Sequence, residues 1–126
     1  MDVGGDTLRV SVAKSGGRTT VALAGELDLY TGPRLRDALD AVIASGAHRI
    51  EVDLRNLTFC DCFGLSILLA ARLDALRVGC AFGIVGPLAQ TVRRLFQLGG
   101  VSRVLPVHPS TPGPAAQTGG APPRSP

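Results

Sequence analysis

The spacing of hydrophobic residues changes repeatedly between Leu8 and Val107, and this change of period is the feature that most restricts the fold. Stretches in which every second residue is apolar are typical of half-buried strands. Stretches with apolar residues three and four apart are typical of amphipathic helices. The expected strands are residues 8–12, 20–24, 48–54, 80–85 and 103–107, and the expected helices are residues 31–45, 62–78 and 86–98. The order β-β-α-β-α-β-α-β predicts a single α/β domain with a mixed, mostly parallel sheet.

Glycine and proline residues mark the ends of these elements. Gly16 and Gly17 separate the first two strands, as in a hairpin. Pro33 stands in the first turn of the first helix, where its missing N–H has no cost. Gly46 ends that helix. Residues 56–61 are expected to connect the third strand to the second helix.

The composition changes after Val107. Residues 108–126 contain six prolines, three glycines and no large apolar side chain. Such a segment buries too little apolar surface to offset the entropy that ordering it would cost. We therefore expect a domain of residues 1–107, followed by a disordered Pro/Gly/Ala-rich tail of residues 108–126.

The charge pattern argues against nucleic acid as a partner, and the lengths of the apolar runs argue against a membrane. The net charge of +3 comes from thirteen basic and ten acidic residues, among which only Arg93 and Arg94 form an adjacent basic pair. No basic stripe follows from this pattern, and four Phe, one Tyr and no Trp leave little aromatic surface for base stacking. No apolar run approaches the roughly 20 residues of a membrane helix, and the first residues lack signal-peptide features. We expect a cytoplasmic protein.

None of the common catalytic patterns occurs in the sequence. A phosphate-binding loop and a G-x-G-x-x-G motif are both absent, and His48 and His108 are the only histidines. Cys60 and Cys62, together with the distant Cys80, do not have the spacing of a zinc site. We expect a protein that is not an enzyme, with no catalytic residue, cofactor or metal.

The second predicted helix has apolar residues on two faces. Asp61 is a suitable N-cap, which places Cys62 and Phe63 in the first turn, at the positive end of the helix dipole. Phe63, Ile67 and Ala70 lie nearly opposite the expected core stripe. That stripe consists of Leu65, Leu69, Leu73 and Leu76. Two interpretations remain open: either both faces are buried, or the second face is an exposed apolar anchor for a partner.

Two segments, GELDLYTGPRL at residues 25–35 and VDLRNLTFCDCFGLSILLAA at residues 52–71, closely resemble the STAS-domain anti-sigma factor antagonists of bacteria. The resemblance extends from Leu8 to Val107. It implies a STAS domain without catalytic activity, whose loop and helix after the third strand bind an anti-sigma factor and thereby free a sigma factor. It also implies that the anti-sigma factor is commonly an ATP-dependent serine kinase, which phosphorylates the antagonist in a D-S-[ST]-G motif, and that a phosphatase restores binding.

This sequence departs from the family motif at the phosphorylated position. The motif reads Asp61-Cys62-Phe63-Gly64, so a thiol replaces the serine hydroxyl, while Thr58 and Ser66 are displaced from the motif. The resemblance therefore implies partner binding without the usual serine phosphorylation switch. The residues that it implies for partner binding are Asp28, Asp61, Cys62, Phe63, Gly64 and Ile67.

Three functions fit these observations. The first is an anti-sigma factor antagonist that is always active or is regulated in another way. The second is a STAS subunit of another complex, such as a lipid-transport ATPase or a signalling assembly. The third is a thiol-redox protein that uses Cys60 and Cys62, because a helix N-terminus lowers the pKa of a thiol. The alternative for Cys60 is a small buried hydrophobic residue.

Overall fold

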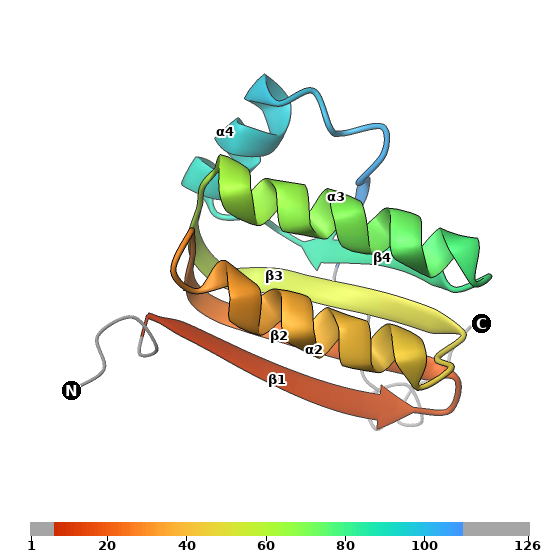
Figure 1. The fold of residues 1–126 in the computed structure, drawn as a ribbon. Coiled ribbons are helices and arrows are strands. Elements are labelled where there is room, and N and C mark those ends of the chain that lie inside the picture. Colours follow the sequence, from red (N-terminus) through yellow and green to blue (C-terminus); the bar gives the residue numbers. More distant parts are fainter. Residues whose placement is uncertain (1–6, 110–126) are drawn as a thin grey trace, which may run out of the picture.

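Within residues 7–109, which the computed structural model describes, the chain forms a five-stranded sheet and three helices (Figure 1). The elements are β1 (Leu8–Ser15), β2 (Arg18–Leu27), α2 (Gly32–Ala44), β3 (Arg49–Cys60), α3 (Cys62–Arg77), β4 (Ala81–Gly86), α4 (Gln90–Leu98) and β5 (Val107–Pro109). The strand order is β1-β2-β3-β4-β5; β1 is antiparallel to β2 and each later pair is parallel. The predicted α/β fold with a mostly parallel sheet is confirmed.

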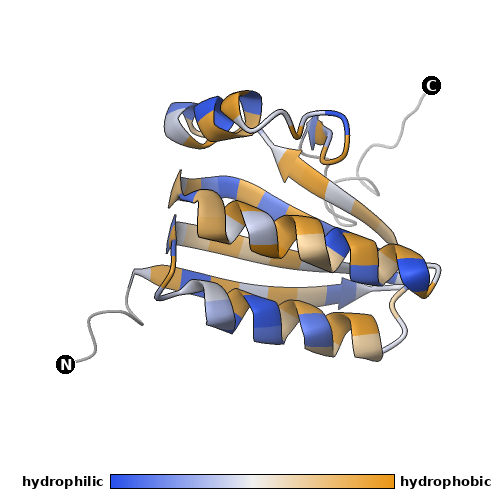
Figure 2. Ribbon diagram, turned by 45° about the horizontal axis from the view of Figure 1, so that its top comes forward, coloured by the Kyte–Doolittle hydropathy of each residue, from blue (hydrophilic) through white to orange (hydrophobic). Residues whose placement is uncertain are grey.

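The two longer helices, α2 and α3, lie side by side on one face of the sheet (Figure 1). Crossovers between neighbouring parallel strands share one hand, so helices that follow β2 and β3 cover the same face. The apolar side chains between the helices and the sheet form the core, and β4 is drawn mainly in hydrophobic colours (Figure 2). The largest core side chains include Leu23, Leu27, Leu35, Leu39, Ile50, Leu54, Leu57, Leu68 and Ile84.

The sheet face away from α2 and α3 carries charged side chains. Arg49, Glu51 and Asp53 alternate along β3 with buried apolar residues. Glu51 forms ion pairs with Arg18 at 3.7 Å and with Arg49 at 3.0 Å, and Asp53 forms one with Arg55 at 2.7 Å. Burial opposes the charged form of Asp53, but the hydrogen bonds and charge of Arg55 outweigh it and lower the pKa of this carboxyl group.

The first part of the chain follows the prediction closely. Ser15 pairs with Arg18 around a tight hairpin turn, and Gly16 adopts the left-handed backbone with φ of 62° that such turns require. The predicted core positions Leu35 and Leu39 of α2 are buried.

None of the helices in residues 7–109 has the length and apolarity needed to cross a membrane.

The third strand is longer than predicted, because β3 continues through most of the predicted connection and ends at Cys60. Its register against β2 shifts twice, between Ala22 and Ala24 and between Gly25 and Glu26, with one extra residue in β3 each time. Such β-bulges interrupt the alternation of buried and exposed positions. The alternation of apolar and polar residues that predicts a strand therefore stops at residue 54, although β3 continues to Cys60.

The last helix and the last strand both begin later than predicted. The backbone at Ala89 is extended, so α4 starts at Gln90 and not at Pro87. Of residues 103–107, predicted as a strand, only Val107 belongs to β5, which pairs with β4. His108 and Pro109, predicted to begin the tail, are therefore part of the sheet. The rest of the predicted tail, residues 110–126, lies outside the described residues.

Candidate functional site

The loops after β2 and β3 lie together at one edge of the sheet (Figure 1). Both strands are parallel, so their carboxyl ends meet at the same edge. In open α/β sheets this edge is where binding sites are commonly built, because the loops there can vary without disturbing the core. The loop before α2 and the first turn of α3 therefore form the candidate site.

Asp61 caps α3 as the sequence predicts. Its backbone is extended, and its carboxylate Oδ1 accepts a hydrogen bond from the Gly64 N–H at 2.9 Å. The Asp61 N–H donates to the Leu27 carbonyl at 3.2 Å, which ties the helix start to the end of β2. Asp61 is only partly exposed. Its first role is therefore to fix where and in which direction α3 begins.

Cys62 and Phe63 are the exposed residues of this first turn, and Phe63 is 40% exposed. The Phe63 ring rests on Gly32 at the start of α2: a Cβ atom there would lie only 2.8 Å from ring atom Cε2. One part of the ring is therefore packed against the protein, while another part is open to a partner. Such a half-anchored aromatic side chain needs little ordering on binding.

The structure decides where two groups of α3 residues lie. Ile67 belongs to the face for which the sequence left burial and exposure both open; it is only 7% exposed, and its Cδ1 atom would lie 2.6 Å from a Cβ on Gly32. Leu73 and Leu76, predicted in the core, are 51% and 47% exposed. The buried face of the helix consists of Gly64, Leu65, Ile67, Leu68, Ala71 and Ala75. This face contains the small residues Ala71 and Ala75. The prediction followed the larger leucines and therefore placed the core stripe on a neighbouring face of the helix.

Gly64 also has a packing role. A Cβ at this position would lie 2.7 Å from Leu27 Cγ and 3.1 Å from Cys60 Sγ, both in the core. The glycine allows the first turn of α3 to approach the end of β2. Gly64 is buried, so it supports the exposed residues of the turn from below and offers little surface to a partner.

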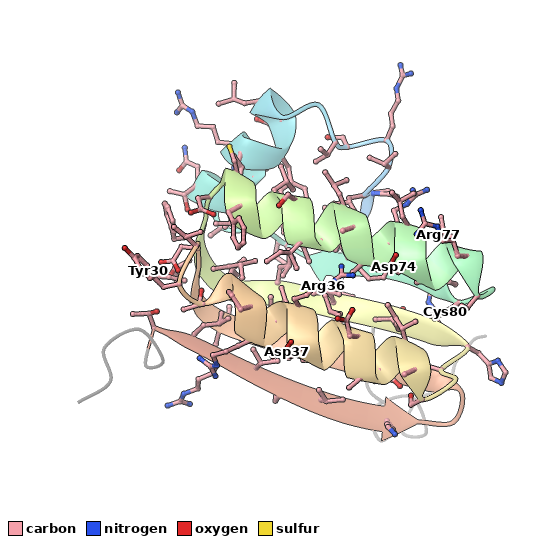
Figure 3. All side chains as sticks on the ribbon, viewed as in Figure 1. Tyr30, Arg36, Asp37, Asp74, Arg77 and Cys80 are labelled. Atoms are coloured by element: carbon pink, nitrogen blue, oxygen red, sulfur yellow. The ribbon has the colours of Figure 1, made fainter. Side chains whose placement is uncertain are left out.

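Asp28 organises the loop before α2. Its carboxylate Oδ1 accepts hydrogen bonds from the N–H groups of Tyr30 at 2.9 Å and Thr31 at 3.0 Å. The Thr31 hydroxyl accepts from the Asp28 N–H and donates to the Glu26 carbonyl. These bonds hold a tight turn whose apolar residues point outward, and Tyr30 projects away from the domain (Figure 3). Asp28 thus shapes the loop that presents its neighbours.

Sequence reasoning missed three exposed apolar residues at this edge. Leu29 and Tyr30 are 56% and 80% exposed, and Phe59, near the end of β3, is 43% exposed. Apolar residues inside predicted loops were the available signal, but their exposure depends on the turn at Asp28 and on the extended β3. We call the group Leu29, Tyr30, Cys62 and Phe63 the α3 apolar surface; Phe59 is not included, because its neighbour Cys60 is the residue that faces α3.

The two cysteines of this region have different environments. Cys60 is buried, and burial, with smaller contributions from the charges of Asp61 and Cys62, raises the pKa of its thiol to about 12. It therefore remains protonated at neutral pH and behaves as a small core residue. Cys62 is exposed. The two thiols are not equivalent partners for redox chemistry.

The hydroxyl groups closest to Cys62 in the sequence, those of Thr58 and Ser66, are hydrogen-bonded to the backbone. The Thr58 hydroxyl donates to the Gly25 carbonyl at 3.0 Å, and the Ser66 hydroxyl donates to the Phe63 carbonyl at 2.6 Å. Thr91 of α4 donates to the Thr58 carbonyl at 2.7 Å, which links α4 to the same strand. Neither Thr58 nor Ser66 occupies the place of Cys62 at the start of the helix.

Comparison with known proteins shows which family and which proteins this chain is similar to. Residues 10–106 match the family described as "Mlab, STAS domain". The chain is 31% identical over 94 residues to the anti-sigma-F factor antagonist RsfB of Mycobacterium tuberculosis, covering 75% of this chain and 76% of that protein. It is 31% identical over 91 residues to an anti-sigma-B factor antagonist of Staphylococcus epidermidis, covering 72% and 83%. The crystal structure of an anti-sigma factor antagonist from Mycobacterium paratuberculosis matches with a TM-score of 0.76 and 29% identity, covering 90% of this chain and 94% of that one.

Proposed function

Because this chain belongs to the STAS-domain family, we propose that it is an anti-sigma factor antagonist: it binds an anti-sigma factor in the bacterial cytoplasm and so frees a sigma factor. It acts by binding and not by catalysis. Its relatives in Mycobacterium tuberculosis and Staphylococcus epidermidis carry this name. The observation that carries the proposal for this chain is the α3 apolar surface, which lies at the motif that the chain shares with the family.

The chemistry of the α3 apolar surface suits a protein partner. Its residues are aromatic or aliphatic apart from the Cys62 thiol, and none carries a charge. Aromatic residues are enriched in the centres of protein interfaces, where few residues supply most of the binding energy. Asp28 and Asp61 hold the two backbone segments that present these side chains, so docking has a low ordering cost.

We further propose that serine phosphorylation does not switch this antagonist. Cys62 offers a thiol at the start of α3, where the family motif has its acceptor hydroxyl. Phe63 adds a bulky ring beside it. The hydroxyls of Thr58 and Ser66 are directed to backbone carbonyls. The protein then remains bound under conditions that release a phosphorylated relative, because no added charge of about −2 disrupts the interface.

The binding proposal is tested with a purified complex of the cognate sigma and anti-sigma factors. Adding the full chain should release free sigma factor in proportion to the amount added, as measured by size-exclusion chromatography. Heat-unfolded chain serves as the control. If the sigma factor stays bound and the full chain does not bind the isolated anti-sigma factor, the proposal is wrong.

The switch is tested separately, with the anti-sigma factor and ATP, by measuring the mass of the intact chain. We expect no added phosphate on the parent protein and one phosphate on Cys62→Ser. Phosphorylation of the parent at Thr58 or Ser66 would contradict the absence of a switch, without affecting the binding result.

A second candidate is a STAS subunit of another complex, which the family description favours because it names Mlab and no sigma regulator. Such a subunit would use the same α3 apolar surface. Affinity purification of the full chain from its native cytoplasm, with the bound proteins identified by mass, distinguishes the two. The thiol-redox alternative has less support, because Cys60 is buried and its pKa is raised.

A further inference from the structure

A concave site lies beside α4 and shares no lining residue with the α3 apolar surface. The cavity measures about 310 Å³ and is formed by α4, the connection between β4 and α4, and the segment that leads into β5. Its wall includes the apolar side chains of Leu88, Phe96, Leu105 and Val107. This volume is at the lower end of the range of small-molecule sites, which is about 300–1,000 Å³.

The floor of this α4 pocket is apolar and rigidly supported. Phe96 and Leu105 are each 2% exposed, because they also belong to the core. Leu88 is half-buried and Val107 is exposed, so the pocket is open on the side of β5. Phe96 and Leu105 expose almost no surface, so the apolar surface that a hydrocarbon group would remove from water belongs mainly to Leu88 and Val107.

The polar groups of the pocket favour a negative charge on the ligand. Arg93 and Gln97, one turn apart on the exposed side of α4, both line it, and no carboxylate from residues 7–109 does. Arg93 forms no ion pair with any residue from Thr7 to Pro109. An unpaired guanidinium beside an apolar floor is complementary to a carboxylate on a short hydrocarbon chain.

We propose that the α4 pocket binds a small amphiphile with one carboxylate, whose hydrocarbon part lies against Leu88 and Val107 above the buried Phe96 and Leu105 and whose charge pairs with Arg93. The pocket shares no lining residue with the α3 apolar surface, so the proposed ligand and the proposed anti-sigma partner contact different side chains. The neighbouring Arg94 does not line the α4 pocket and provides a matched control.

The probe is decanoate, added to the full chain and followed by backbone and methyl NMR, with decanol and decyltrimethylammonium as uncharged and cationic analogues. We expect saturable shifts at Leu88, Leu105 and Val107, strongest for decanoate. Arg93→Gln should weaken decanoate binding about tenfold, the size expected for one hydrogen bond to a charged group, and should leave decanol binding unchanged. Arg94→Gln should change decanoate binding less than twofold, within the range of a screened surface charge.

Several results would overturn the proposal. One is the absence of saturable binding of decanoate up to about 1 mM, a concentration that detects dissociation constants in the micromolar range. Another is equal binding of the cationic analogue, and a third is an equal loss of affinity in Arg93→Gln and Arg94→Gln. A fourth is a pocket already filled in the ligand-free protein, seen as nuclear Overhauser contacts from prolines of residues 110–126 to the Phe96 ring.

Discussion

The two halves of α3 both expose apolar side chains, but their surroundings differ. In the first half, Phe63 is exposed beside the uncharged Cys62. In the second half, the exposed Leu73 flanks Asp74, which forms ion pairs with Arg36 of α2 and Arg77 of α3. Figure 3 shows Arg36, Asp74 and Arg77 grouped along the two helices, far along α3 from its first turn.

This difference shows that exposure alone does not identify a docking site. Single exposed leucines are ordinary on protein surfaces. A partner that covered the second half would also have to remove water from Asp74 and Arg77, and burying charged groups costs several kcal/mol unless new partners compensate. The first half carries no such cost, and the hydrogen bonds of Asp61 fix its backbone beforehand. The first half is therefore the better docking site.

The largest expected effect concerns the packing beneath the first half. Gly64→Val should lower the free energy of unfolding by about 3 kcal/mol, because its side chain would overlap Leu27 in a filled core. Ser66→Val is the control, since it places the same β-branched residue on the exposed side of the same helix. Urea unfolding measures both. Equal losses would mean that close packing at Gly64 does not set the position of the first turn.

Next in size is the effect of removing the exposed ring. Phe63→Ala should weaken binding of the anti-sigma factor by about 1–3 kcal/mol, whereas Leu73→Ala should change it by less than about 0.5 kcal/mol. Calorimetric titration gives the affinities, and thermal unfolding shows that both variants are folded. If Leu73→Ala weakened binding as much as Phe63→Ala, the distinction between the two halves would be lost.

The order of elements could be predicted because most of them are amphipathic. Leu35 and Leu39 of α2 repeat at helical spacing and are buried as predicted. The prediction failed where the local period does not report burial. In β3, two bulges break the alternation, and in α3 the core face is lined by Ala71 and Ala75, while larger leucines are exposed. Both outcomes depend on how elements pack together, which no single segment specifies.

The candidate site also has one part that the sequence predicts and another part that it does not. The cap at Asp61 was predictable, because N-capping is a local property of residue type and position. The exposure of Tyr30 was not predictable, because it depends on hydrogen bonds from the loop to Asp28 and on the place of that loop beside the start of α3. The burial of Ile67 was not predictable either, because it comes from contact with Gly32 on another helix.

A smaller effect should follow from loss of the cap. Asp61→Ala removes the acceptor for the Gly64 N–H and should lower the free energy of unfolding by about 1 kcal/mol. Asp61→Asn, which keeps a side-chain oxygen, should lose only a few tenths of that amount. Guanidinium unfolding of both variants distinguishes the cases. An equal loss in the two variants would mean that the charge of Asp61, and not its hydrogen bond, stabilises the start of α3.

The smallest effect is expected in the second half of α3. Asp74→Asn removes ion pairs with Arg36 and Arg77 that are partly exposed, and we expect the two together to contribute only about 0.5 kcal/mol. Arg36 keeps its ion pair with Asp40 at 3.2 Å, which limits the loss further. Asp37→Asn is the matched control, because Asp37 forms no ion pair with any residue in the described part of the chain and lies exposed on α2 (Figure 3).

The salt dependence and the partner affinity of Asp74→Asn complete this test. Unfolding measured at low and high ionic strength should show the difference between Asp74→Asn and Asp37→Asn shrinking as salt screens the ion pairs. Affinity for the anti-sigma factor should be the same for both variants and the parent, because Asp74 lies outside the α3 apolar surface. A loss of affinity in Asp74→Asn that matched Phe63→Ala would instead place the partner along the charged half of α3, and the apolar residues of the first turn would then need another explanation.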